Sequence, residues 1–487
     1  MAAKFSQHSA TFTDGDAKRF QHVLGIVPSS DAALNDKSIP GLAILNTILK
    51  RRGNKPADLQ TTPISGEIGN DACAAWVAID QSKTVFEQQS SIRKGLALLL
   101  HDNLEGIAIS VHGPAAFRHN AAQLALYATL INGAVLPVRK KEDKRKALSD
   151  IGLFGTTLAG SGKREQAIAS GNTLTRSLTM LPPNELPPAQ YRKRIRALAK
   201  EHDWAHDVYD MKKLRKLGAG AFVAVAQGSA EDDAAIVHLR YRAKGAKKTI
   251  ALVGKGICFD TGGHNLKPAK YMYGMHEDMN GSAVALGALL AASTLKLPVN
   301  IDCWLAIAQN HIGPKAYKQN DIVTALNGTT IEIVHTDAEG RMVLADTLTL
   351  ASRAKPDLIV DYATLTGSMH VALGSRRSGI FANRPEWQTR AIEAGERSGE
   401  RVTAFPLDAD YDVALDSKIA DIKQCTDDGN ADHILAARFL SKFLDDTPWI
   451  HMDLSASSHS GGLGAVASDV TGFGVAWTIE LLEGMAK

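Results

Sequence analysis

Residues 249–263 have the sequence TIALVGKGICFDTGG, an apolar run that ends in an acidic residue and two glycines. An apolar run of this length bounded by glycine is typical of a buried strand. Further strand-like runs follow in 299–307, 329–336, 357–365 and 449–456. Helix-like segments lie between them, among them 282–294 and 341–354. This alternation predicts a central, mostly parallel sheet flanked by helices.

The sequence before this region predicts a smaller α/β domain. Short buried strands are expected at 74–80 and 106–113, and a helix at 119–133 that ends at Gly133. The prolines of PPNELPP (182–188) stop any helix. We therefore predict an α/β fold in three parts, with a smaller N-terminal domain, a connecting helix and a larger C-terminal domain: 1–160, 161–181 and 182–487.

Composition narrows the class of protein. The chain has 487 residues, of which 45% are hydrophobic and 22% charged, so we expect a folded globular protein rather than a disordered or fibrous one. The net charge is +3, which gives little overall attraction to nucleic acid or to a lipid surface. Four scattered cysteines, no leader-like N-terminus and no long apolar run predict a cytoplasmic protein without a membrane segment.

Acidic residues gather where strands end. Asp260 follows the apolar Ile-Cys-Phe, Asp278 precedes a helix of small residues, and Asp337 and Glu339 follow the strand-like run 329–336. Asp337, Glu339 and Arg341 stand at alternate positions, so in extended chain they would point the same way. On this second segment alone, an N-terminal helix cap with acids at the dipole is an equally good interpretation.

The four carboxylates together favour a metal site. Clustered acids repel one another unless cations neutralise them, and a carboxylate-rich site suits Mg, Mn or Zn. Four carboxylates exceed the needs of one ion, which favours two metals sharing a water. Lys267 and Arg341 would then stabilise an oxyanion. The residues by themselves predict a two-metal hydrolase and leave peptide and phosphate ester open as substrates.

Two segments resemble the signatures of the leucyl aminopeptidase family, the cytosolic dimetal exopeptidases. HTDAEGR (335–341) is similar to the family's NTDAEGR, and GKGICFDTGG with the following NLK and DMNG (254–281) is similar to its lysine and aspartate motifs. Shorter matching motifs extend the resemblance over most of the C-terminal domain, in 182–188, 224–229, 363–367, 417–423, 449–456 and 470–475.

The resemblance implies an aminopeptidase that releases neutral or apolar N-terminal residues such as Leu from short peptides. It implies two Mn²⁺ or Zn²⁺ ions bound by five residues: Lys255, Asp260, Asp278, Asp337 and Glu339. Lys267 would polarise the scissile carbonyl, and Arg341 would hold a bicarbonate ion that acts as the general base. Met275, Thr364 and Gly367 would line the pocket for the first side chain. The family's homohexamer is also implied.

Some positions depart from the family pattern, and other functions stay open. His335 replaces an Asn on the substrate side, and Asn280 replaces a Gly, so both bear on which peptides fit. DNA binding is an alternative function, supported by a basic run at 139–146 with six Lys or Arg. Hydrolysis of phosphate esters is a further alternative, disfavoured because the sequence offers no basic phosphate cradle beyond Lys267 and Arg341.

Overall fold

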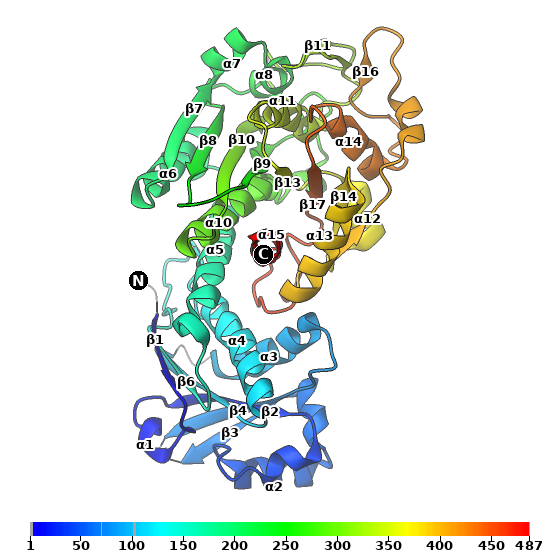
Figure 1. The fold of residues 1–487 in the computed structure, drawn as a ribbon. Helices are drawn as coiled ribbons and strands as arrows, with labels where there is room; N and C mark the ends of the chain where they lie inside the picture. The colour runs from blue at the N-terminus through cyan, green and yellow to red at the C-terminus, as the bar shows by residue number, and fades with distance from the viewer. Residues whose placement is uncertain (1–2, 70, 101–103, 487) are drawn as a thin grey trace. The chain divides into compact units, whose positions relative to one another are not determined.

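The computed structural model describes residues 3–69, 71–100 and 104–486, which form two compact units (Figure 1). The first contains residues 1–173, 396–399 and 460–471, and the second contains 174–395, 400–459 and 472–487. The division falls inside helix α5 (Lys163–Thr179), the helix that the sequence predicts as a connector. The domain limits at 160 and 182 stay a prediction, since these units also exchange short later segments.

The first unit is built on a six-stranded sheet with the order β1-β6-β5-β2-β4-β3, parallel except for the edge strand β3. Trp76 of β4 belongs to the core on the side of α2, whereas its neighbour Val77 contacts Gly95 of α3, as alternation along a strand requires. The strands predicted at 74–80 and 106–113 and the helix at 119–133 are confirmed. The strands are β1 (Lys4–His8), β2 (His22–Pro28), β3 (Ile64–Gly69), β4 (Ala72–Ile79), β5 (Gly106–Val111) and β6 (Asp150–Phe154), and the helices are α1 (Asp14–Ala17), α2 (Leu42–Arg52), α3 (Val85–Leu100) and α4 (Ala115–Asn132).

The basic run at 139–146 is exposed along its whole length but forms no strand. Two of its cations make ion pairs with nearby acids: Arg145 with Asp143 at 2.9 Å and Lys146 with Glu105 at 2.5 Å. For this run the sequence favours an exposed strand edge or a turn over an anion-binding site; the run is exposed and lies outside any strand. The paired acids reduce the charge that this run can offer to a polyanion.

The second unit is built on an eight-stranded sheet with the order β15-β14-β17-β13-β9-β10-β8-β7. The four central strands, β17, β13, β9 and β10, are parallel, and antiparallel pairs lie toward the edges. The predicted parallel centre is confirmed. The strands are β7 (Ala205–Asp210), β8 (Ala235–Tyr241), β9 (Thr249–Asp260), β10 (Asn300–Asn310), β13 (Leu358–Ala363), β14 (Ser378–Ala382), β15 (Val402–Ala404) and β17 (Trp449–Asp453).

Helices cover both faces of this sheet, and two of them fix the central strand β9. Gly254 of β9 faces Ser282 of α10, and a Cβ at Gly254 would lie 2.4 Å from its backbone. The next residue, Lys255, lies against Gly340 of α11. Since neighbours in a strand point to opposite faces, α10 and α11 lie on opposite sides of β9. The helices are α6 (Pro188–Glu201), α7 (Met211–Leu217), α8 (Gly220–Ala226), α9 (Ala269–Met272), α10 (Asn280–Thr294), α11 (Glu339–Arg353), α12 (Gly367–Leu373), α13 (Pro385–Ser398), α14 (Asp432–Ser441) and α15 (Val475–Ala486).

The run at 329–336 is not a strand of the main sheet. Only Thr330–Glu332 forms a strand, β12, in a small sheet with β11 (Ile322–Thr324) and β16 (Ile422–Lys423). Beyond it, the backbone N–H groups of Val334 and His335 donate to the side-chain oxygen of Gln424, at 3.0 and 3.1 Å, instead of to a neighbouring strand. The prediction of a long strand here is wrong, because the Gln424 side chain accepts the backbone hydrogen bonds that a neighbouring strand would accept. Among the helices described, none is long and apolar enough to cross a membrane.

Candidate metal centre

A pocket of about 610 Å³ in the second unit is lined by the ten residues predicted to bind metal, to catalyse or to bind substrate, whereas Asn280 is buried outside its lining, with its amide donating to the Thr179 hydroxyl at 3.0 Å. They come from distant parts of the chain but meet at the carboxyl ends of the parallel strands, where sites form in sheets of this kind. The predicted residues in its lining are Lys255, Asp260, Lys267, Met275, Asp278, Asp337, Glu339, Arg341, Thr364 and Gly367.

A β-bulge sets the direction of Asp260. The pairing of β9 with β10 joins Ile257 to Ala308 and then Asp260 to Asn310, so β9 carries one extra residue over this interval. An extra residue reverses the alternation of side chains along a strand. Asp260 therefore faces the same side of the sheet as Lys255, five positions earlier, although period-two spacing alone would separate them.

Asn310 fixes the Asp260 carboxylate. The Asn310 amide donates to Asp260 Oδ1 at 2.8 Å and to the carbonyl of Thr336 at 3.0 Å. The Gly262 N–H donates to the same Asp260 oxygen at 2.8 Å. One amide thus ties the strand carboxylate to the loop that carries Asp337. The sequence prediction missed Asn310, and the signal for it was its position at the end of a strand parallel to β9.

The carboxylates form one cluster around two lysines. Oxygens of Asp260, Asp337 and Glu339 all lie within 4.8 Å of one another. The Lys255 ammonium lies 2.7 Å from Asp278 and 2.8 Å from Glu339. The Lys267 ammonium lies 2.9 Å from Asp260 and 2.6 Å from Asp337. Each lysine therefore bridges two carboxylates on one half of the cluster.

Burial and mutual repulsion shift the protonation of these groups. Burial raises the pKa of Asp337 to about 7, and the nearby charges of Glu339 and Asp260 add to this rise. Burial also raises the pKa of Asp278 and of Glu339, again with neighbouring carboxylates contributing. Burial alone would lower the pKa of Lys255, but the surrounding acids outweigh it and raise that pKa. The site is thus short of positive charge.

The donor set fits divalent cations. Four carboxylates face two lysines, so the charge count is four negative against two positive. Asp278 Oδ2 is buried and has no hydrogen-bond partner among the described residues, while Asp337 Oδ1 and Glu339 Oε1 are buried with only a lysine ammonium beside each, at 2.6 and 2.8 Å. Buried carboxylate oxygens without donors are costly, and hard or borderline divalent ions satisfy them. Lys255 can serve as a ligand only as a neutral amine, so metal binding there must release its proton.

The positions of Asp337, Glu339 and Arg341 arise differently from the prediction. Asp337 lies in a turn, whereas Glu339 and Arg341 belong to the first turn of α11, which begins two residues earlier than expected. Residues two apart on a helix do not face each other. Glu339 accordingly contacts Lys255, while Arg341 points to other partners. The extended-chain argument is wrong, although all three side chains line one pocket.

Arg341 is buried and already bound on two sides. Its Nη2 donates to Asp432 Oδ1 at 2.7 Å, and its Nη1 donates to the carbonyl of Gln424 at 3.1 Å. Burial alone would lower the pKa of Arg341, but the Asp432 charge leads the effects that raise it. Asp432 lines the same pocket and was not predicted. No local sequence signal pointed to it, because it lies 91 residues from its partner in the chain.

Thr364 links the substrate side of the pocket to the acids. Its hydroxyl donates to Asp278 Oδ1 at 2.7 Å, and its carbonyl accepts from Lys255 at 2.8 Å. Met275 precedes Asp278 in the same 3₁₀ turn (Met275–Met279), and Gly367 begins α12. No heavy atom lies within 4 Å of a Cβ built on Gly367, so this stretch of the wall is open.

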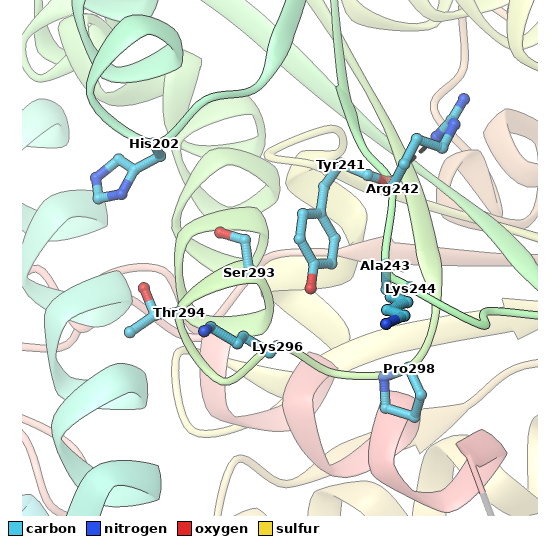
Figure 2. Close-up of a pocket in the computed structure, with 9 residues that line it drawn as sticks. All are labelled: His202, Tyr241, Arg242, Ala243, Lys244, Ser293, Thr294, Lys296 and Pro298. Atoms are coloured by element: carbon cyan, nitrogen blue, oxygen red, sulfur yellow. Dashed lines mark hydrogen bonds between the residues drawn. The ribbon is translucent and has the colours of Figure 1, made fainter.

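A second pocket of the same unit, of about 390 Å³, has the opposite character (Figure 2). Lys244, Lys296, Arg242 and His202 line it together with hydroxyl side chains, and its described lining includes no carboxylate. It therefore offers no ligand set for a divalent cation. The metal-binding chemistry of the described chain is concentrated in the larger pocket.

Comparisons with known proteins identify relatives of the part of the chain that contains this pocket. Residues 173–479 match the model of the cytosol aminopeptidase family, catalytic domain. A probable cytosol aminopeptidase of Stutzerimonas stutzeri is 45% identical over 62% of this chain and 61% of its own length. One from Nitrobacter winogradskyi is 40% identical over 69% of this chain and 68% of its own length. The match thus spans less than two thirds of the first relative.

Solved structures share the fold over nearly the whole chain. The bottromycin maturation enzyme BotP, in complex with Mn, superposes with a TM-score of 0.82 at 29% identity. The match covers 96% of this chain and 100% of the BotP chain. All ten predicted site residues lie within the matched range 173–479 of this chain. With more than half of its residues matched to that model, the chain belongs to the cytosol aminopeptidase family.

Proposed function

We propose that this protein is a metal-dependent aminopeptidase that removes the N-terminal residue of short peptides. The observation that carries the proposal is the buried cluster of four carboxylates and two lysines in one open pocket. Membership of the family supports the same reaction class. The pocket also offers apolar and hydroxyl side chains beside the acids, which suits an amino-acid side chain better than a phosphate group.

Five residues would hold two Mn²⁺ or Zn²⁺ ions: Lys255, Asp260, Asp278, Asp337 and Glu339. When bound, such ions polarise a peptide carbonyl and make a neighbouring water more acidic. The buried Asp278 Oδ2, which has no hydrogen-bond partner among the described residues, and the excess of carboxylates over lysines support this assignment. The free amine of a substrate is a further ligand, so a peptide with a blocked N-terminus should be a poor substrate.

Lys267 would act on the scissile carbonyl. Its ammonium lies between Asp260 and Asp337, at 2.9 and 2.6 Å, and its side chain is only 15% exposed. Burial alone would lower the pKa of Lys267, but these acids outweigh it and raise the pKa, so the group stays charged. A fixed ammonium in a partly dry site stabilises developing negative charge on oxygen far better than water does.

Arg341 would stabilise an anion beside the reacting water. The family resemblance implies bicarbonate in this role. In this chain the Arg341 guanidinium already contacts the Asp432 carboxylate, so an external anion would have to displace that carboxylate or bind beside it.

Substrate preference would come from the pocket wall. Met275 is apolar and adaptable, Thr364 supplies a hydroxyl, and Gly367 leaves space, a combination that favours Leu and similar neutral residues. His335 lies in the same lining and would contact the second residue of the peptide. A homohexamer in the cytoplasm, as in the family, completes the proposal.

Hydrolysis of leucine p-nitroanilide tests the proposal directly. Protein stripped of metal should be inactive, and Mn²⁺ or Zn²⁺ should restore turnover. An aryl phosphate assayed in parallel should stay intact, and so should N-acetyl-leucine p-nitroanilide. Folded, metal-loaded protein that cleaves none of a panel of aminoacyl anilides and dipeptides would refute the aminopeptidase assignment.

A further inference from the structure

The ion pair between Arg341 and Asp432 brings a carboxylate of this chain into the candidate metal pocket. Arg341 lies in the first turn of α11, and Asp432 is the first residue of α14. Arg341 Nη2 donates to Asp432 Oδ1 at 2.7 Å, and the Asp432 side chain is 23% exposed. Asp432 thus contacts a buried guanidinium with one oxygen while its side chain stays partly exposed. This arrangement resembles a carboxylate ligand bound to the arginine more than a fully buried ion pair.

The surroundings hold this carboxylate in place. The Gln424 carbonyl accepts from Arg341 Nη1 at 3.1 Å, which orients the guanidinium toward Asp432. The residue before Asp432, Ala431, adopts a left-handed conformation with φ of 51°, which costs a residue with a Cβ about 1 kcal/mol or more. The loop thus accepts backbone strain while it presents Asp432 at the start of a helix, where negative charge is favoured.

The second carboxylate oxygen of Asp432 is available to accept a proton. Asp432 Oδ2 accepts no hydrogen bond from the described residues. Asp432 lines the pocket together with Asp337 and Glu339, so its carboxylate shares the water-accessible space with the proposed metal ligands. A carboxylate fixed by an arginine and open on one side has the chemistry of bicarbonate bound to that arginine.

We propose that Asp432 is a built-in replacement for the external anion at Arg341 and serves as the general base of the peptidase. This inference rests on the proposed function. The Asp432 carboxylate accepts a proton from the attacking water as the new carbon–oxygen bond forms. It then gives that proton to the leaving amine as the carbon–nitrogen bond breaks, so the carboxylate is regenerated. Turnover consequently needs no bicarbonate.

Chemical rescue separates this role from a structural one. The variants are Asp432→Ala, which opens space for a small anion, and Asp432→Asn, which fills that space without charge. Asp410→Asn is the charge-matched control, since Asp410 is exposed and outside the pocket lining. Each is loaded with Mn²⁺ and assayed on leucine p-nitroanilide in carbonate-free buffer, then with added bicarbonate or formate.

We expect bicarbonate to change wild-type and Asp410→Asn kcat less than about twofold. Asp432→Ala and Asp432→Asn should each lose kcat by about a hundredfold, the usual size of a general-base contribution. Bicarbonate or formate should restore at least about tenfold to Asp432→Ala and nothing to Asp432→Asn. A structural ion pair would give no such difference between the two variants. Wild-type turnover that needs bicarbonate, or a fully active Asp432→Ala in carbonate-free buffer, would overturn the inference.

A measurement of bicarbonate binding tests the inference independently of peptidase activity. With Zn²⁺-loaded protein, ¹³C NMR of labelled bicarbonate should show binding to Asp432→Ala but not to wild type. The double variant Arg341→Ala/Asp432→Ala should bind none. If wild type cleaves no aminoacyl anilide, the proposed function fails, while this measurement still decides whether Asp432 occupies the anion site. Bicarbonate binding by wild type as tight as by Asp432→Ala would contradict that occupancy.

Discussion

Helix α11 carries two buried acids, Glu339 and Asp346, whose surroundings differ completely. Asp346 Oδ2 accepts the N–H of Phe222 at 2.8 Å, and its Oδ1 accepts the N–H of Leu326 at 2.7 Å. Glu339 lies about two turns earlier on the same helix. Its Oε1 lies 2.8 Å from the Lys255 ammonium, a group that it shares with Asp278.

Burial raises the pKa of both acids, to about 7 for Asp346. A raised pKa therefore does not separate a structural acid from a functional one. The partners do: Asp346 joins two backbone segments, and both of its oxygens are satisfied. Glu339 belongs to a group of four acids that share two lysines, and the excess negative charge of that group is what a cation site requires.

The largest expected effect is on the metal cluster. Asp337→Ala removes a proposed ligand, and we expect kcat/KM to fall by at least about a thousandfold, since metal polarisation supplies several kcal/mol. Its far-UV circular dichroism should match wild type, because Asp337 lies in a turn at the pocket rather than in the core. Full activity in folded Asp337→Ala would remove this residue from the site.

Asp346→Ala should show the opposite behaviour. It leaves the N–H groups of Phe222 and Leu326 buried without an acceptor, and we expect the free energy of unfolding to fall by about 2–5 kcal/mol. The folded fraction should keep kcat within about twofold of wild type, because the hydrogen bonds of Asp346 go to backbone N–H groups and not to residues of the pocket. Urea unfolding with a parallel assay measures both. A large loss of kcat without loss of stability would contradict a purely structural role for Asp346.

Asn310→Ala tests a residue that acts through Asp260. Loss of the hydrogen bond to Asp260 Oδ1 should weaken metal affinity by about 10–100-fold, as for other groups that orient metal ligands. Asn327→Ala is the control, because its amide donates to the Lys442 carbonyl far along the chain. Calorimetric titration of Zn²⁺ into stripped protein distinguishes them. Equal affinities in the two variants would assign Asn310 a structural role only.

A further expected effect is a pH dependence of stability without metal. Asp337 and Asp346 both have a pKa of about 7 in the folded protein, above the ordinary 3.8, so their folded forms retain protons that the unfolded chain releases. Stability should consequently fall as the pH rises from about 4 through about 7. Metal binding needs ionised Asp337, so added Zn²⁺ should raise the melting temperature more at about pH 8 than at about pH 5. Scanning calorimetry measures this, and an equal rise at both pH values would contradict a proton-linked site.

Much of the site was predictable from local sequence because each acid follows an apolar run or precedes a helix. Asp260 ends β9, Asp278 and Asp337 lie just before helices and Glu339 begins one, so the sequence alone was enough to group the four acids. The alternation of strands and helices likewise predicted the parallel centre of the larger sheet. These features depend on neighbours in the chain, which the sequence displays directly.

The tertiary structure decided what depends on distant partners. The bulge in β9, visible only in its pairing with β10, turns Asp260 to the side of Lys255. Gln424 ends the strand expected at 329–336, and the pairing of Arg341 with Asp432 joins residues 91 apart. Sequence alone predicted most of the candidate residues of the pocket, though not Asn310 or Asp432, because composition and local periodicity are properties of the chain. Their directions and partners were decided only by folding, because pairing register and side-chain contacts exist between segments and not within them.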